Sequence, residues 1–235
     1  MKRTFACSDL HGMWSLFCQI NSFLTEEDRI FFLGDAGDRG PDGWKIIKAI
    51  MEDPRWIYLK GNHEQMLVNA MLDEINDEWG SDAEQLLIYN GGYETIEAWR
   101  MDGRNAEWAY KLNRLPTNVS FENDEGKLLW PSHAGFTPGR DGKLIPDEHS
   151  LIWDRQHLIH RWPEGYDNFT IIHGHTPIPS IGRRLGIPVE EGALYYANGH
   201  KICIDNASFA SGISCLLDLN LFDEHIFTIP NFNNS

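Results

Sequence analysis

Short apolar runs alternate with amphipathic segments along the first third of the chain. The runs 4–8, 29–33 and 56–60 are rich in β-branched and aromatic residues, which favours strands. Apolar side chains recur at helical spacing between Trp14 and Leu24 and again over 44–51. This alternation predicts three βα units and a fold of the α/β class.

The rest of the chain is first helical and then mainly sheet. Residues from about Glu64 to Leu115 have a helix-like pattern with turn signals at 90–92 and 102–103, which predicts a helical insertion. We expect the segment 182–191, which is rich in glycine, proline and charge, to be a loop. The later runs that favour strands are 118–122, 128–132, 170–172, 201–205, 213–218 and 225–229.

The composition suits a single soluble domain. With 235 residues and 42% hydrophobic content, the chain can bury a sizeable core and has no internal spacer. We therefore expect one domain over residues 1–235, with the helical insertion at about 64–115. No apolar run approaches the roughly 20 residues that span a bilayer, and Asp9 interrupts the first run, which predicts a cytoplasmic protein.

The charge narrows the choice of partners. A formal net charge of −15 argues against nucleic acid or an anionic membrane as a partner, because binding to polyanions depends on basic surface. An anionic substrate would need a local positive centre.

Five polar motifs stand where predicted strands end. Ligand sites of open α/β sheets lie beyond the carboxyl ends of strands, so we expect these motifs to meet at one site. Together they offer neutral imidazoles, carboxylates and an amide oxygen, which suit Mn, Fe or Zn better than Ca or Mg. The set predicts a dinuclear transition-metal site. The motifs are Asp-Leu-His-Gly at 9–12, Gly-Asp-Ala-Gly-Asp-Arg-Gly at 34–40, Gly-Asn-His-Glu at 61–64, Ser-His-Ala-Gly at 132–135 and His-Gly-His-Thr-Pro at 173–177.

Each motif alone has a simpler explanation. Asp9 could cap the helix that begins after Gly12, and Gly34 or Gly61 could simply permit a tight turn. Five motifs in order, each with a metal-competent side chain at a strand end, favour a metal site over unrelated caps and turns.

The same ordered set resembles the phosphoprotein phosphatase branch of the calcineurin-like metallophosphoesterases over residues 7–177 at least. Further motifs at 61–66, 90–92, 152–155 and 174–177 are similar to the bacteriophage lambda-type and bacterial serine/threonine protein phosphatases. The resemblance implies a four-layer sandwich in which helices flank two mixed β-sheets. It also implies a metal-dependent hydrolase whose substrate is a phosphorylated protein or a small phosphoester.

The resemblance further implies two divalent metal ions per chain and no other cofactor. Manganese is the expected metal, with iron or zinc as alternatives. The implied ligands are Asp9, His11 and Asp35 for one metal, and the bridging Asp35, Asn62, His133 and His175 for the other. His173 would lie behind the ligands, with a core or hydrogen-bonding role as the alternative.

The resemblance also implies the catalytic side chains. Water activated by the two metals would attack the phosphorus directly. His63 is the candidate general acid for a poor leaving group, and Asp38 would orient its ring and keep it protonated. Arg39 and Arg155 would lie on the substrate side, where a guanidinium fork can bind two phosphate oxygens.

The chain departs from its relatives at two places. Asp-Asn-Ala-Ser at 205–208 stands where they have Asp-Thr-Gly, and Ala36-Gly37 replaces a bulkier Leu-Val pair. Neither change removes an implied ligand, although the first is expected to alter packing on the substrate side.

Two rival functions remain open. The nearer is a symmetrical dinucleoside tetraphosphate hydrolase of the same superfamily, although that group tends to have Trp after the histidine of 174–176. The other is a catalytically silent metal-binding scaffold. The intact His63, Asp38, Arg39 and Arg155 count against a silent protein.

Overall fold

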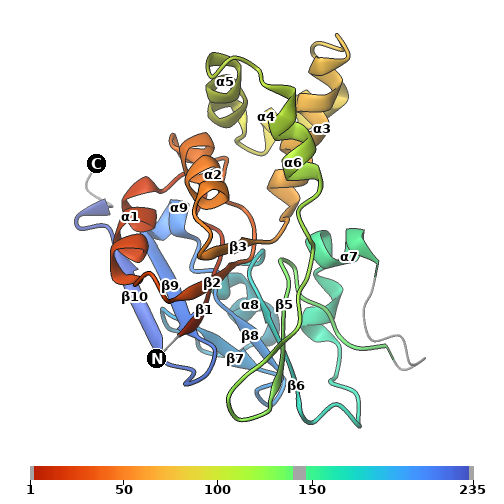
Figure 1. The fold of residues 1–235 in the computed structure, drawn as a ribbon. Coiled ribbons are helices and arrows are strands. Elements are labelled where there is room, and N and C mark those ends of the chain that lie inside the picture. The colour runs from red at the N-terminus through yellow and green to blue at the C-terminus, as the bar shows by residue number, and fades with distance from the viewer. Residues whose placement is uncertain (1–2, 140–146, 233–235) are drawn as a thin grey trace.

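Two five-stranded mixed sheets form the centre of the structure, a computed structural model that describes residues 3–139 and 147–232 (Figure 1). The first sheet has the order β10-β9-β1-β2-β3, in which β1, β2 and β3 are parallel. The second has the order β4-β5-β6-β8-β7, in which β5, β6 and β8 are parallel. The strands of the first sheet are β1 (Thr4–Cys7), β2 (Arg29–Phe32), β3 (Trp56–Tyr58), β9 (Ile213–Asp218) and β10 (Glu224–Thr228). Those of the second are β4 (Phe121–Glu122), β5 (Leu128–Pro131), β6 (Phe169–His173), β7 (Leu194–Tyr196) and β8 (Lys201–Cys203).

Alternating side chains pack the two sheets against each other. Along β1, Ala6 belongs to a buried cluster that also contains Ile172 of β6 and Ile202 of β8, so this face lies between the sheets. Its neighbours Phe5 and Cys7 point to the opposite face and join a cluster with the helices. Both faces of β1 are therefore buried.

Helices cover the outer faces of the two sheets. α1 (Trp14–Phe23) and α2 (Gly43–Glu52) share the cluster of Phe5, while α8 (Ile178–Leu185) packs on Leu194 and Cys203 of the second sheet. α7 (Glu148–Trp153) packs through Leu151 on Ile171 of β6. A short 3₁₀ helix, η1 (Gln156–Ile159), follows α7. The helix–sheet–sheet–helix order confirms the predicted four-layer fold.

The predicted helical insertion is a group of four helices that stands beyond one edge of the sheets (Figure 1). Side chains of Ser81 and Asn105 accept hydrogen bonds from backbone N–H groups of the first turns that follow them, which caps two of these helices. The buried Glu74 carboxylate forms ion pairs with Arg100 and Arg104, at 2.7 and 2.6 Å, and links the first helix to the third. The helices are α3 (Asn62–Ile75), α4 (Asp82–Tyr89), α5 (Tyr93–Met101) and α6 (Ala106–Asn113).

Some predicted elements differ from the structure. The predicted loop at 182–191 begins only at Gly186, because α8 continues to Leu185 and ends on that left-handed glycine (φ 67°). The strand expected at 118–122 is reduced to β4 and an isolated bridge between Asn118 and Ser132. Sequence patterns missed β7, α7 and the one-turn helix α9 (Ser208–Ser211), which are too short to show a period. Among the described residues, no helix has the length and apolar character needed to cross a bilayer.

Candidate metal centre

All six predicted ligands follow strands that run in the same direction within their sheet, and all six are buried. The parallel strands of each sheet deliver them to one edge of the fold. They are Asp9 and His11 after β1, Asp35 after β2, Asn62 at the start of α3 after β3, His133 after β5 and His175 after β6.

The backbone of these turns is strained. Six non-glycine residues of the motifs have a left-handed conformation, with φ between 43° and 67°, a region that side chains with a Cβ rarely adopt. Backbone hydrogen bonds hold the turns together, since the N–H groups of Asp9 and His11 donate to Gly34 and Asp35 carbonyls, each at 3.0 Å. Such strain persists where the surrounding structure over-determines the chain, and it clusters at functional sites. The six residues are Asp9, His11, Asp35, Asp38, Arg39 and His175.

The first predicted metal group surrounds the Nε2 atom of His11. Its Nδ1–H donates to the Gly37 carbonyl at 2.9 Å, which leaves the Nε2 lone pair facing inward. Nε2 lies 3.7 Å from Asp35 Oδ2 and 3.9 Å from Asp9 Oδ1. His63 also approaches this group, with its Nε2 at 3.9 Å from Asp35 Oδ2, so four side chains converge where three ligands were predicted.

The ligand atoms of the second predicted metal group lie closer together than those of the first. The His133 Nδ1–H donates to the Leu33 carbonyl at 2.8 Å, so its Nε2 lone pair faces inward. This Nε2 lies 2.9 Å from Asn62 Oδ1, 3.1 Å from His175 Nδ1 and 3.4 Å from Asp35 Oδ2. His175 Nδ1 in turn lies 2.9 Å from Asn62 Oδ1. Ligands that share one cation with bonds of about 2.0–2.3 Å lie roughly 3–3.7 Å apart, so this donor set fits a metal ion.

The ionisation of the buried carboxylates also fits cation binding. Burial, together with the neighbouring Asp205 and Asp35 carboxylates, raises the pKa of Asp9 well above its usual value. Burial raises the pKa of Asp205 to about 6, and the Asp35 carboxylate adds to this shift. Burial acts in the same sense on Asp35, but the adjacent His133 and His63 outweigh it and hold its pKa well below the usual range. Crowded buried carboxylates of this kind are relieved by a bound cation.

His63 and Asp38 form the predicted pair. His63 Nδ1 lies 2.6 Å from Asp38 Oδ2, and both side chains are buried. Burial lowers the pKa of His63, but the Asp35 and Asp38 carboxylates prevail and raise it overall. The Asp38 backbone N–H donates to Thr95 Oγ1 of α5 at 2.9 Å, so the helical insertion holds the turn that carries the pair.

The two predicted arginines lie at the same site in different ways. The Arg39 guanidinium donates to His11 Nε2 at 2.7 Å, its other terminal nitrogen lies 3.0 Å from His63 Nε2, and its backbone N–H donates to the Gly91 carbonyl. Arg155, just before η1, is exposed, and its side chain makes no hydrogen bond with the described residues. Desolvation lowers its pKa, and the nearby Asp35 carboxylate partly opposes that shift.

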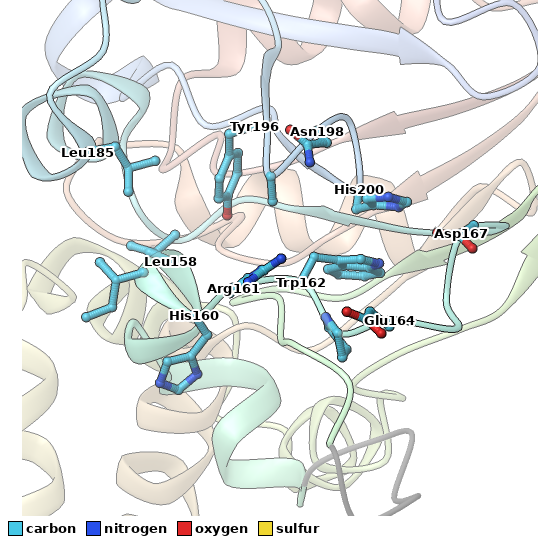
Figure 2. A pocket seen from close by; sticks show the side chains of 13 residues that line it. Leu158, His160, Arg161, Trp162, Glu164, Asp167, Leu185, Tyr196, Asn198 and His200 are labelled. Atoms are coloured by element: carbon cyan, nitrogen blue, oxygen red, sulfur yellow. The ribbon is translucent and has the colours of Figure 1, made fainter.

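His173 does not join the ligands. Its Nδ1–H donates to the Gly174 carbonyl at 3.0 Å, and its Nε2 lies 2.7 Å from the Tyr196 hydroxyl. Tyr196 belongs to the lining of a separate pocket, in which it lies near Arg161 and Trp162 (Figure 2). None of the predicted ligands or catalytic residues lines that pocket. His173 therefore has the hydrogen-bonding role that was the alternative expectation.

Glu64 is a buried residue of the site that sequence reasoning passed over. Its Oε2 accepts from the backbone N–H groups of Asp35 and Gly61, both at 2.8 Å. Its Oε1 accepts from the Ala36 N–H at 2.9 Å and the Tyr58 hydroxyl at 2.7 Å. One carboxylate thus joins the turns after β2 and β3. The sequence contains a signal for this role, because a glutamate three residues after a helix N-cap is the acidic half of a capping box.

A second contribution that was missed comes from the C-terminal half. The Ser208 hydroxyl of α9 donates to the Asp9 carbonyl, and Phe209 packs beside Arg39 and His11. More than 160 residues separate these partners in the sequence, so no local pattern could have joined them.

Comparisons with known proteins find similar phosphatases and phosphoesterases. A bacterial relative, "Serine/threonine-protein phosphatase 2" of Salmonella typhimurium, is 25% identical over 224 residues, which cover 90% of each chain. The symmetrical "Bis(5'-nucleosyl)-tetraphosphatase" of Buchnera aphidicola is 26% identical over 143 residues, 59% of this chain and 46% of that one. A metallophosphoesterase from Sphaerobacter thermophilus has the same fold, with a TM-score of 0.56 at 16% identity over 97% of this chain and 88% of that chain.

A family model covers most of the chain as well. Calcineurin-like phosphoesterase is the description of that model, and it matches residues 2–204, which include every predicted ligand and catalytic residue. With this match and the site at the strand ends, the chain belongs to the calcineurin-like phosphoesterase family and is a phosphatase-type hydrolase.

Proposed function

We propose that this chain hydrolyses phosphomonoesters, with phosphorylated serine or threonine residues of proteins as its substrate class. The observation that carries the proposal is the meeting of a carboxylate–imidazole pair, a guanidinium and two groups of metal-competent atoms around Asp35. A binding protein would need the metal-competent atoms alone. The extra presence of His63, Asp38 and Arg39 supports a reaction in which a proton and a phosphoryl group are handled together.

In this proposal Asp35 would help to hold both of two divalent ions. Asp9 and His11 complete one group, and the atoms Asn62 Oδ1, His133 Nε2 and His175 Nδ1 complete the other. When bound, the two ions supply Lewis acidity, which activates water and neutralises the phosphoryl oxygens. Imidazole, amide and carboxylate donors suit manganese, iron or zinc, and manganese is the metal that we propose.

His63 acts as the general acid. The Asp38 carboxylate accepts from Nδ1–H at 2.6 Å, which orients the ring and directs Nε2 into the site. A proton on Nε2 can pass to the alkoxide oxygen of the leaving serine or threonine as the phosphorus–oxygen bond breaks. An alkoxide is a poor leaving group, so this transfer contributes most with phosphoserine and phosphothreonine.

Arg39 and Arg155 bind the phosphate. Each guanidinium presents paired N–H donors that match two phosphate oxygens. The terminal nitrogens of Arg39 already point at His11 and His63. Arg155 comes from the other half of the chain, and the nearby Asp35 and Asp9 carboxylates act on its pKa. With the two ions they make the centre positive within a chain of net charge −15.

The protein substrate class is supported by the Salmonella relative, whose similarity extends over 90% of this chain. The rival substrate, a dinucleoside tetraphosphate, is supported by the Buchnera relative over 59% of the chain. Both substrates offer a phosphoryl group to the same centre, so the choice depends on the surrounding surface.

A substrate panel tests the proposal. The enzyme is reconstituted with manganese and its kcat/KM is measured on a phosphoserine or phosphothreonine peptide, a phosphotyrosine peptide and diadenosine tetraphosphate. His63→Asn protein purified in parallel controls for contaminating phosphatases. We expect the first peptide to give the highest kcat/KM. A preference for diadenosine tetraphosphate would assign the rival function.

A further inference from the structure

The segment from Asp205 to Gly212 approaches the metal centre from the C-terminal half of the chain. It is stiffened from within, because the Asp205 carboxylate accepts from the Ala207 N–H at 2.8 Å and the Ser211 hydroxyl donates to the Asn206 carbonyl at 2.8 Å. The Ser208 hydroxyl then anchors it to the Asp9 carbonyl. The backbone of this segment therefore presents the next residue, Phe209, in one defined position.

Phe209 lies between two residues of the site. The Arg39 Cζ atom stands 4.6 Å from the centroid of its ring, which is the geometry of a cation–π contact. The His11 ring meets it edge to face, with centroids 5.5 Å apart and an interplanar angle of 84°. The side chain is half-buried, so it is not simply part of the core.

The contact with Phe209 is made at the Cζ atom, whereas the terminal nitrogens of Arg39 are directed at His11 Nε2 and His63 Nε2. A metal ion held by His11 Nε2 would take the lone pair that accepts from Arg39, so this hydrogen bond and metal binding exclude each other. The cation–π contact with Phe209 does not use that lone pair, so it is compatible with metal binding and with terminal nitrogens that turn to phosphate oxygens.

We propose that Phe209 is the positioning residue that holds the Arg39 guanidinium for phosphate binding. The proposal rests on the proposed function, because it takes Arg39 as a phosphate-binding group. The Arg39 backbone is held by the Gly91 carbonyl at 2.7 Å, so the insertion positions the main chain and Phe209 positions the end of the side chain.

The test compares Phe209→Leu, Phe209→Tyr and a matched control, Phe222→Leu. Phe222 is also half-buried, and it also contacts a cation, with Lys127 Nζ 5.3 Å from its ring centroid. It lies outside the site. The Kd for inorganic phosphate is measured by calorimetry on the manganese-loaded protein. Metal content by elemental analysis, the melting temperature, and kcat and KM on p-nitrophenyl phosphate are recorded for each variant.

We expect Phe209→Leu to raise the Kd for phosphate and the KM by about 3- to 30-fold, the range that a cation–π contact of ordinary strength corresponds to. Its metal content and melting temperature should match those of Phe222→Leu, and kcat should change less than KM. Phe209→Tyr keeps the ring and should stay near wild type. In an Arg39→Lys background, which lacks the planar cation, Phe209→Leu should have little further effect.

Distinct results would overturn distinct claims. An unchanged phosphate Kd in Phe209→Leu, or an equal loss in both Arg39 backgrounds, would overturn the assignment of Phe209 and leave the proposed function intact. Loss of bound metal in Phe209→Leu would also overturn it, since the residue would then support His11. Wild-type protein that neither binds phosphate nor hydrolyses the ester would overturn both claims.

Discussion

At the His63 side chain, proton donation can be separated from metal binding. The ring is held by Asp38 at 2.6 Å, while its neighbour Asn62 carries the predicted ligand oxygen. We expect His63→Asn to keep its metals and to lower turnover of a phosphoserine peptide by about 10²- to 10⁴-fold. The loss on p-nitrophenyl phosphate should be smaller, because that leaving group needs less protonation.

The matched control for this prediction is His160→Asn. His160 is an exposed histidine whose side chain lies in the separate pocket of Figure 2. The His160→Asn variant should leave turnover of the phosphoserine peptide and of p-nitrophenyl phosphate unchanged. Equal losses of His63→Asn on the two substrates would argue against a general acid at that position.

Asp35 belongs to both predicted metal groups. Its Oδ2 lies 3.7 Å from His11 Nε2 and 3.4 Å from His133 Nε2. Asp35→Asn keeps the size of the side chain but removes the charge and one acceptor, so we expect both metals to be depleted. Elemental analysis after dialysis checks this, with Asp28→Asn as the control at a buried aspartate whose carboxylate accepts hydrogen bonds from Arg3 and Thr25. A fully loaded and active Asp35→Asn enzyme would contradict the bridging role.

At the scale of elements, Glu64 joins the ends of β2 and β3 to the first turn of α3. Its carboxylate accepts three backbone hydrogen bonds and one from Tyr58. Glu64→Gln replaces one oxygen by an amide that cannot accept, which leaves buried donors without partners. We expect the free energy of unfolding to fall by about 2–4 kcal/mol, together with weaker metal binding. Urea unfolding measures it, with the exposed Glu26→Gln as the control; equal stability of the two variants would contradict the role of Glu64.

Lys201 links β8 to η1, the element that follows Arg155. Its fully buried ammonium donates to Thr137 Oγ1 at 2.7 Å and to the His157 carbonyl. Burial lowers its pKa to about 8, against about 10.4 in the unfolded chain. Between these pH values the unfolded chain binds more protons than the folded one. The contribution of Lys201 to the free energy of unfolding therefore increases as pH rises.

The Lys201→Met variant tests whether the buried ammonium makes stability depend on pH. The free energy of unfolding of wild type should rise relative to the variant by roughly 1.4 kcal/mol for each pH unit between about 8 and about 10. Denaturant unfolding at pH 7, 8, 9 and 10 measures the difference. Parallel pH profiles for the two proteins would show that the ammonium is not destabilised by burial.

The elements also show what the sequence could predict. Polar motifs at strand ends are local signals, and parallel strands bring their ends together, so the meeting of the six predicted ligands with His63, Asp38 and Arg39 could be predicted from the sequence. Phe209 and Ser208 reach the site from a one-turn helix, which has no periodicity to detect. Lys201 lies in a run that was predicted as an ordinary strand, and its burial depends on Thr137 and on a carbonyl of η1, which are far away in sequence.

For the whole molecule, we propose that residues 1–235 form a single phosphoesterase domain that includes the helical insertion. Val68, Leu87 and Leu112 of the insertion share one buried cluster with Phe5 and Ile30 of the first sheet, among the residues that the structure describes. The insertion also holds the catalytic turn, because Thr95 accepts from the Asp38 N–H and the Gly91 carbonyl accepts from the Arg39 N–H. Separate melting of insertion and sheets in calorimetry would contradict a single unit.

In the proposed function, two divalent ions held around Asp35 make this chain a phosphomonoesterase. The most direct test titrates manganese into chelator-treated protein and follows turnover of p-nitrophenyl phosphate against metal equivalents per chain. We predict negligible turnover without metal and a rise that saturates at two equivalents. Full turnover of the metal-free protein, or saturation at a single equivalent, would contradict it.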